Sequence, residues 1–110
     1  MKKLALLILF AASPAFAHAR LAGSDPAPES KVKAVKTIKL SFSEKLEPAF
    51  SGASLSEADG KPLPVPSSVA GSTITLLPMS LKPGRYKVEY HGVGHDTHRV
   101  AGSFFFDLVP

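Results

Sequence analysis

The clearest fold signal lies in the stretch KPGRYKVEY, residues 82–90. Pro83 followed by Gly84 is typical of a tight turn, because proline presets its backbone angle and glycine tolerates a left-handed one. From Tyr86 to Tyr90 apolar and charged side chains alternate, which is the period of a strand with one buried face. This stretch predicts a turn that leads into a half-buried β-strand.

The same kind of signal recurs outward in both directions. Residues 38–42 alternate in the same way. Further strands are expected at residues 53–56, 73–77 and 100–109. Proline and glycine punctuate the chain between them, and no segment keeps a helical period for three turns. Short strands separated by turns predict an all-β fold, a β-sandwich or Greek-key barrel, in one domain.

The first 17 residues have the composition of a secretory signal peptide. Lys2 and Lys3 precede an apolar run over residues 4–12, which is too short to span a bilayer. The sequence Ala15-Phe16-Ala17 then places small residues where a signal peptidase reads them. We therefore expect cleavage after Ala17, export to the periplasm, and a mature domain over residues 18–110 that does not span the membrane.

The composition excludes several classes of function. The chain has no cysteine, so thiolate metal sites, cysteine nucleophiles and disulfides are excluded. Loss of Lys2 and Lys3 lowers the formal net charge from +4 to +2, and the remaining lysines are scattered. A nucleic-acid-binding surface would be more basic and more clustered. Met79 is the one methionine left after cleavage, so a metal site has to be built from histidine, carboxylates and the amino terminus.

Four residues carry donors that suit a metal ion. His18, as the new first residue, offers its ring Nδ1 and an α-amine, a group that ordinarily releases its proton at about pH 7.7–8.0. Asp96 and His98 are spaced i, i+2, which in extended backbone directs both side chains to one face. Glu44 follows the strand at residues 38–42 and could approach from an adjacent loop.

This donor set favours copper over other metals. Three nitrogens and one oxygen suit the tetragonal geometry of Cu(II), whereas Zn(II) accepts similar ligands but prefers a tetrahedral site. The soft ligands that select Cu(I) are missing. His91 and His95 are expected at the surface or the rim, because alternation turns them away from their neighbours. We therefore expect one Cu(II) ion per chain.

The order and spacing of short motifs resemble the CopC family of periplasmic copper-binding and copper-resistance proteins. The motifs are His18-Ala19-Arg20-Leu21, Leu40-Ser41-Phe42-Ser43-Glu44, LKPGRYKV at residues 81–88, and Asp96-Thr97-His98. The resemblance runs nearly the length of the mature chain and implies an immunoglobulin-like Greek-key β-sandwich or barrel. It also implies a partner, an inner-membrane copper transporter of the CopD type, and Cu(II) ligands that fall on His18, Asp96 and His98, with Glu44 near copper in some members.

The chain departs from the family pattern in three places. Residues 56–68 contain no methionine or histidine where some members carry a Met-rich loop, so no Cu(I) site is expected. Tyr90 stands where a tryptophan is common. His95 and Arg99 flank the Asp96-Thr97-His98 motif and change its rim: His95 could add a ligand, and Arg99 could hold Asp96.

Three functions compete on these observations. A non-enzymatic role in copper sequestration, resistance or delivery agrees with the lack of a nucleophile–base pair and of a cofactor motif. A copper-dependent oxidase or monooxygenase with an N-terminal histidine brace is the alternative, although Asp96 would fill a position that the oxidant needs. A structural β-sandwich without metal is the third, and it predicts that His18→Ala changes nothing.

Overall fold

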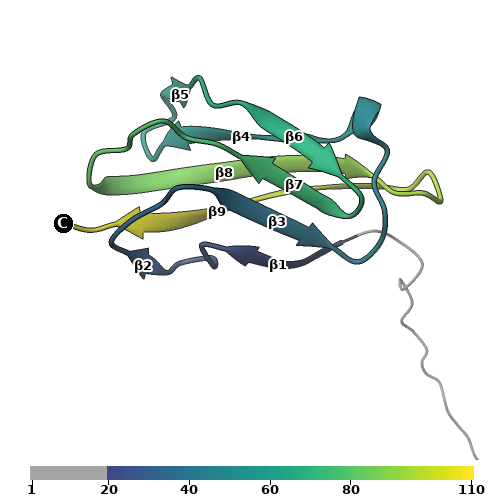
Figure 1. Ribbon diagram of the computed structural model, residues 1–110, viewed down its shortest axis with the longest axis horizontal. Helices are drawn as coiled ribbons and strands as arrows, with labels where there is room; N and C mark the ends of the chain where they lie inside the picture. Colours follow the sequence, from purple (N-terminus) through teal and green to yellow (C-terminus); the bar gives the residue numbers. More distant parts are fainter. Residues whose placement is uncertain (1–19) are drawn as a thin grey trace, which may run out of the picture.

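The computed structural model describes residues 20–110, which form two β-sheets that face each other (Figure 1). The four-stranded sheet has the order β1 (Leu21–Asp25), β3 (Ile38–Phe42), β7 (Thr73–Leu76) and β6 (Ser67–Ala70). The five-stranded sheet has the order β2 (Lys31–Val32), β9 (Arg99–Leu108), β8 (Gly84–Val93), β4 (Gly52–Glu57) and β5 (Pro62–Leu63). One 3₁₀ turn, η1 (Pro48–Phe50), precedes β4.

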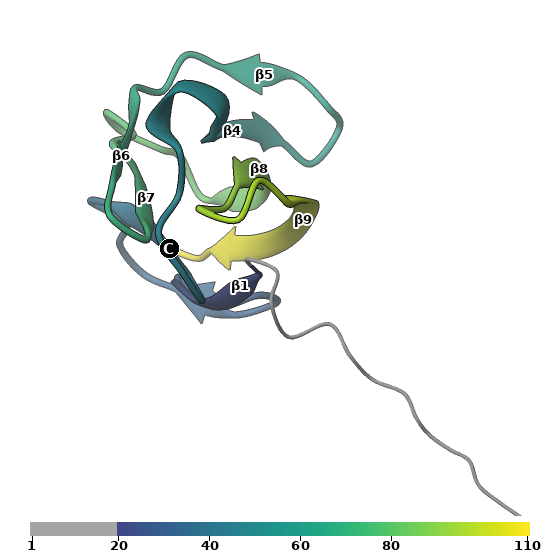
Figure 2. The same ribbon diagram turned by 90° about the vertical axis from the view of Figure 1, so that its right-hand side faces the viewer.

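The hairpin of β8 and β9 runs the length of the sandwich. Its register extends from Gly84 opposite Leu108 to Val93 opposite Arg99, and the loop at residues 94–98 closes it. The other strand pairs are antiparallel as well, except that β2 runs parallel to β9. Seen from the end, the two sheets curve around a common interior (Figure 2). The hairpin therefore carries its closing loop to one end of the sandwich.

The core lies between the sheets and follows the alternation in the sequence. Ile38, Leu40 and Phe42 are buried while Lys39 and Ser41 are exposed. Tyr86 and Val88 of β8 are buried in the same way, and the core is completed by Leu46, Leu55, Ile74, Leu76, Phe104, Phe106 and Leu108. Each such side chain contributes about 1.5–3 kcal/mol when fully buried, so this core can stabilise a chain without disulfides.

Aromatic pairs link the two sheets and pack the hairpin. The ring of Tyr90 contacts Phe42 across the interior, with centroids 5.6 Å apart and an angle of 69°. Tyr86 stacks on Phe106 within the hairpin at 5.7 Å. The prediction of an all-β, immunoglobulin-like sandwich is confirmed. Within residues 20–110, no helix is long and apolar enough to cross a membrane.

An ion-pair cluster on the outer face fastens the segment before β2 to the hairpin. Arg85 of β8 donates to Glu29 at 2.9 Å and to Asp107 of β9 at 3.2 Å. Its guanidinium also lies over the ring of Phe105, 4.6 Å from the centroid. The hydrogen bond to Glu29 is the main cause of a raised pKa for Arg85. This cluster lies at the end of the hairpin away from the 94–98 loop.

Candidate metal centre

The loop at residues 94–98 is a compact turn held by its own backbone. The Gly94 N–H donates to the carbonyl of His98 at 2.9 Å, and the Thr97 N–H donates to the carbonyl of Gly94 at 2.8 Å. Thr97 has φ of 70°, a left-handed conformation that is uncommon for a residue other than glycine. The loop therefore reverses direction within a few residues and presents its side chains at the tip of the hairpin.

Asp96 and His98 come together in this turn. Asp96 Oδ1 accepts a hydrogen bond from the His98 N–H at 3.1 Å, and Asp96 Oδ2 lies 3.1 Å from His98 Nδ1. The side chains are 29% and 55% exposed, although the Oδ2 atom of Asp96 is itself buried. The predicted proximity is present, but its predicted cause is wrong: an Asp side chain folding back on the backbone, rather than strand alternation, joins the two residues.

Glu44 and His18 are the other two expected ligands. Glu44 lies two residues after the end of β3 and is partly buried. His18 lies outside the described residues. Within residues 20–110, no group of three His, Asp or Glu side chains could hold a metal ion. Asp96 and His98 thus supply one oxygen and one nitrogen, a donor pair that suits copper but needs further ligands from elsewhere in the chain.

The segment at residues 43–47 touches both the start of the described chain and the 94–98 loop. At one end, Ser43 and Arg20 exchange two hydrogen bonds, 2.9 Å and 3.0 Å long. At the other, the carbonyl of Lys45 accepts from the His95 N–H at 3.0 Å. The motif Leu40-Ser41-Phe42-Ser43-Glu44 carries no sequence signal that Ser43 and the residues after it connect two parts of the molecule.

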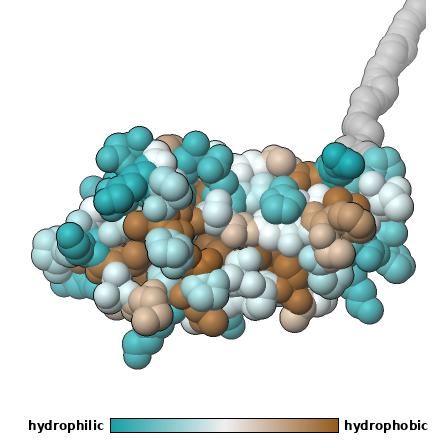
Figure 3. All heavy atoms as spheres, turned by 90° about the horizontal axis from the view of Figure 1, so that it is seen from above, coloured by the Kyte–Doolittle hydropathy of each residue, from teal (hydrophilic) through white to brown (hydrophobic). Residues whose placement is uncertain are grey.

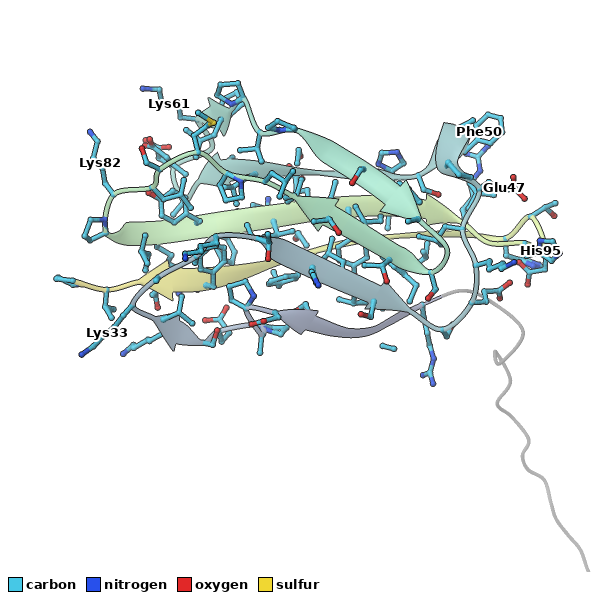
Figure 4. All side chains as sticks on the ribbon, viewed as in Figure 1. Lys33, Glu47, Phe50, Lys61, Lys82 and His95 are labelled. Atoms are coloured by element: carbon cyan, nitrogen blue, oxygen red, sulfur yellow. The ribbon has the colours of Figure 1, made fainter. Side chains whose placement is uncertain are left out.

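His95 and His91 lie where alternation placed them, at the surface. The exposed His95 sits at the hairpin tip, at the same end as Glu47 and Phe50, whereas Lys33, Lys61 and Lys82 lie at the opposite end (Figure 4). His91 is exposed on β8 opposite Gly52, and its ring lies over that glycine: an added Cβ there would be 3.4 Å from Cε1.

A groove of about 790 Å³ lies at the end of the sandwich that carries the 94–98 loop. Val93, Val100 and Ala101 contribute apolar surface to it, and its polar members are Glu47, His91, Thr97 and Arg99. Phe50, which is 64% exposed, also lines it. Apolar surface shows between polar side chains elsewhere on the sandwich as well (Figure 3). Thr97 belongs both to the groove and to the turn that joins Asp96 to His98.

Met79 lies far from the 94–98 loop. It is 89% exposed in the connection between β7 and β8, at the end where β8 begins. A single exposed thioether is a poor Cu(I) site, since soft metal ions are held by several sulfur ligands. The structure of residues 20–110 therefore leaves the prediction that the chain has no Cu(I) site unchanged.

Comparison with known proteins gives a consistent result. Residues 21–109 match the family model of the CopC domain. Copper resistance protein C of Xanthomonas campestris pv. juglandis is 37% identical over 108 residues, covering 89% of this chain and 85% of the relative. The crystal structure of CopC from Methylosinus trichosporium OB3b superposes with a TM-score of 0.79 at 29% identity, covering 84% of this chain and 95% of that one. PcoC, a methionine-rich copper resistance protein from Escherichia coli, gives a TM-score of 0.69 at 34% identity, covering 83% and 98%.

Proposed function

This chain belongs to the CopC family, and from this premise we propose that it binds one Cu(II) ion in the periplasm through His18, Asp96 and His98. Glu44 is proposed as a further donor. The family consists of copper resistance proteins and not of enzymes, which sets aside the monooxygenase alternative. The Cu(II) oxidation state, the ligands and the periplasmic location are all part of this proposal.

The observation that carries the proposal is that Arg20, near His18 in sequence, and the loop with Asp96 and His98 are both hydrogen-bonded to the segment at residues 43–47. Arg20 is hydrogen-bonded to Ser43, and the 94–98 loop is hydrogen-bonded to Lys45 two residues further on. His18 is two positions before Arg20, and each step along the chain spans at most about 3.6 Å, so His18 is within roughly 7 Å of the Arg20 position. That reach makes a site shared by His18 and the Asp96–His98 pair feasible.

The chemistry of the donors supports Cu(II). An amino-terminal His contributes an amine and an imidazole nitrogen in one chelate, His98 a third nitrogen and Asp96 an oxygen. Such a nitrogen-rich, four-donor set suits tetragonal Cu(II). The Asp96 carboxylate also lies beside the His98 ring, where it orients the imidazole, as partners of metal-binding histidines commonly do.

The proposal depends on the leader. If residues 1–17 are a signal peptide cleaved after Ala17, export to the periplasm and creation of the His18 amine are one event. The mature domain, residues 18–110, would then sequester Cu(II) or deliver it to an inner-membrane transporter of the CopD type. Exposure of His98 at the hairpin tip is compatible with such transfer, because a partner's ligand can approach the metal there.

A Cu(II) titration of two purified proteins tests this proposal. One begins at His18, and the other begins at His18 with its α-amine acetylated, which removes the amine nitrogen from the chelate. The first is expected to bind one Cu(II) with a tetragonal, nitrogen-rich electron paramagnetic resonance (EPR) spectrum, and the second to bind far more weakly. Equal binding by both would place the ligands elsewhere, and binding by neither would refute the copper site.

A further inference from the structure

We propose that Ser43 is a positioning residue for the copper site: its hydroxyl holds Arg20, where the N-terminal arm of residues 18–20 joins the fold, against the segment at residues 43–47, which is also hydrogen-bonded to the 94–98 loop. This inference rests on the proposed function and deepens it. It assigns a role to a residue that contributes no ligand.

The first step is the contact at the arm. The β1–β3 ladder ends with Leu21 opposite Phe42. One residue beyond it, the Arg20 N–H donates to Ser43 Oγ at 3.0 Å, and the Ser43 N–H donates to the carbonyl of Arg20 at 2.9 Å. The hydroxyl therefore continues the pairing of the two strands where the regular ladder stops. It fixes the direction in which the chain leaves Arg20 toward His18.

The second step is the rigidity of the support. Leu46 is only 6% exposed, its N–H donates to the carbonyl of Gly71 at 3.0 Å, and it forms a bridge with Gly94. The Glu47 N–H donates to the carbonyl of Val93 at 2.8 Å. Together with the contact between Lys45 and the loop, these bonds anchor residues 43–47 to both sheets. An arm fastened to Ser43 is thereby fastened relative to Asp96 and His98.

The functional consequence is preorganisation. When only a fraction of the molecules hold the arm in the binding position, the apparent dissociation constant rises in inverse proportion to that fraction. One hydrogen bond of ordinary net strength changes such a population about three- to ten-fold. Loss of the Ser43 hydroxyl is therefore expected to weaken Cu(II) binding by about that factor, without removing any ligand.

The test uses two variants of nearly the same shape. Ser43→Thr keeps the hydroxyl and Ser43→Val replaces it with a methyl group, while both suit a β-strand. Ser41→Val is the matched control, because Ser41 is exposed on the same strand two residues earlier. In proteins that begin at His18, Ser43→Val is expected to bind Cu(II) about three- to ten-fold more weakly and to broaden the EPR signal. Ser43→Thr and Ser41→Val are expected to match the parent.

A copper-free measurement separates this inference from the proposed function. Hydrogen exchange at the Arg20 amide is expected to be faster in Ser43→Val than in Ser43→Thr. Equal copper affinity of these two variants, or equal exchange at Arg20, overturns the role of Ser43 while leaving the copper site intact. A parent protein that binds no Cu(II) instead overturns the proposed function, and this shows before any variant is compared.

Discussion

The side chain of Leu46 packs so close to Gly92 that a Cβ atom there would be crowded. An added Cβ at Gly92 would lie 3.2 Å from Leu46 Cδ2 and 3.4 Å from Val100 Cγ1. Gly92 is buried and stands two residues before Gly94, where the 94–98 loop begins. Glycine at this position lets Leu46 pack directly on β8, so the segment at residues 43–47 stays close to the loop that it supports.

Replacing Gly92 by alanine is therefore expected to destabilise the fold. Crowding against the buried Leu46 and the partly buried Val100 should lower the free energy of unfolding by about 1–3 kcal/mol. Denaturant unfolding followed by circular dichroism measures the change. Gly23→Ala is the control, because nothing lies within 4 Å of a Cβ built there. Its effect should stay within about 0.5 kcal/mol, and equal losses in the two variants would contradict the packing role of Leu46.

The second prediction concerns alkaline pH. Burial, reinforced by the negative charge of Glu57, raises the pKa of Tyr86 above its ordinary value of 10.0. Because the folded state holds the Tyr86 proton more tightly than the unfolded chain does, this group contributes its full stabilisation below pH 10. That stability is lost as the pH rises from 10 through the pKa of the folded state.

Absorbance of tyrosinate during alkaline titration measures this effect. Tyr86→Phe keeps the ring that stacks on Phe106 but removes the titrating hydroxyl. In the titration, the variant is expected to lack the tyrosine that ionises at the higher pH. Its free energy of unfolding is expected to decline less steeply above pH 10. If the parent and the variant decline in parallel, burial of the Tyr86 hydroxyl does not control the alkaline stability.

Much of the fold could be predicted from the sequence, because the alternation of buried and exposed residues is local. The strands at residues 38–42 and 86–90 lie where the pattern placed them. The two-residue strand β2 is too short to leave a pattern, and it is held by its backbone pairing with β9, beside the ion pairs of Arg85 with Glu29 and Asp107. Such a strand depends on tertiary contacts and cannot be found by periodicity.

The site was harder to predict than the fold. The spacing of Asp96 and His98 predicted that the two side chains lie close together, but through an incorrect conformation, because the left-handed backbone of Thr97 depends on the closed turn around it. The role of Ser43 requires knowing that residues 20 and 95 meet the same short segment. Tyr90 leaves no room for a side chain at Gly102, because an added Cβ would lie 2.5 Å from its hydroxyl.

The third prediction tests the carboxylate of the proposed site. Asp96→Asn keeps an oxygen that can accept from the His98 N–H but removes the negative charge, so the turn should persist while Cu(II) binds at least about ten-fold more weakly, or ~1.4 kcal/mol. Asp59 is a matched control, because its Oδ1 accepts from the Lys61 N–H at 2.9 Å in a similar turn at the other end of the molecule.

Competition against a coloured chelator gives the two affinities, and thermal unfolding without metal checks the fold. Asp59→Asn is expected to bind copper as the parent does. Weakening of similar size in both variants would indicate a general electrostatic effect on a positively charged metal ion and would remove Asp96 from the ligands.

The last prediction concerns His95, whose ring is exposed at the hairpin tip beside Asp96. Its structural contact is made by its backbone, since the N–H donates to the carbonyl of Lys45, and this bond survives replacement by alanine. His95→Ala is therefore expected to retain one Cu(II) per chain with unchanged nitrogen hyperfine structure in the EPR spectrum. His98→Ala, which removes a proposed ligand, should lose one nitrogen coupling and weaken binding strongly. If the His95 variant also loses a coupling, the resting site includes the His95 ring, and the ligand set has to be redrawn around three imidazoles on two segments of the chain.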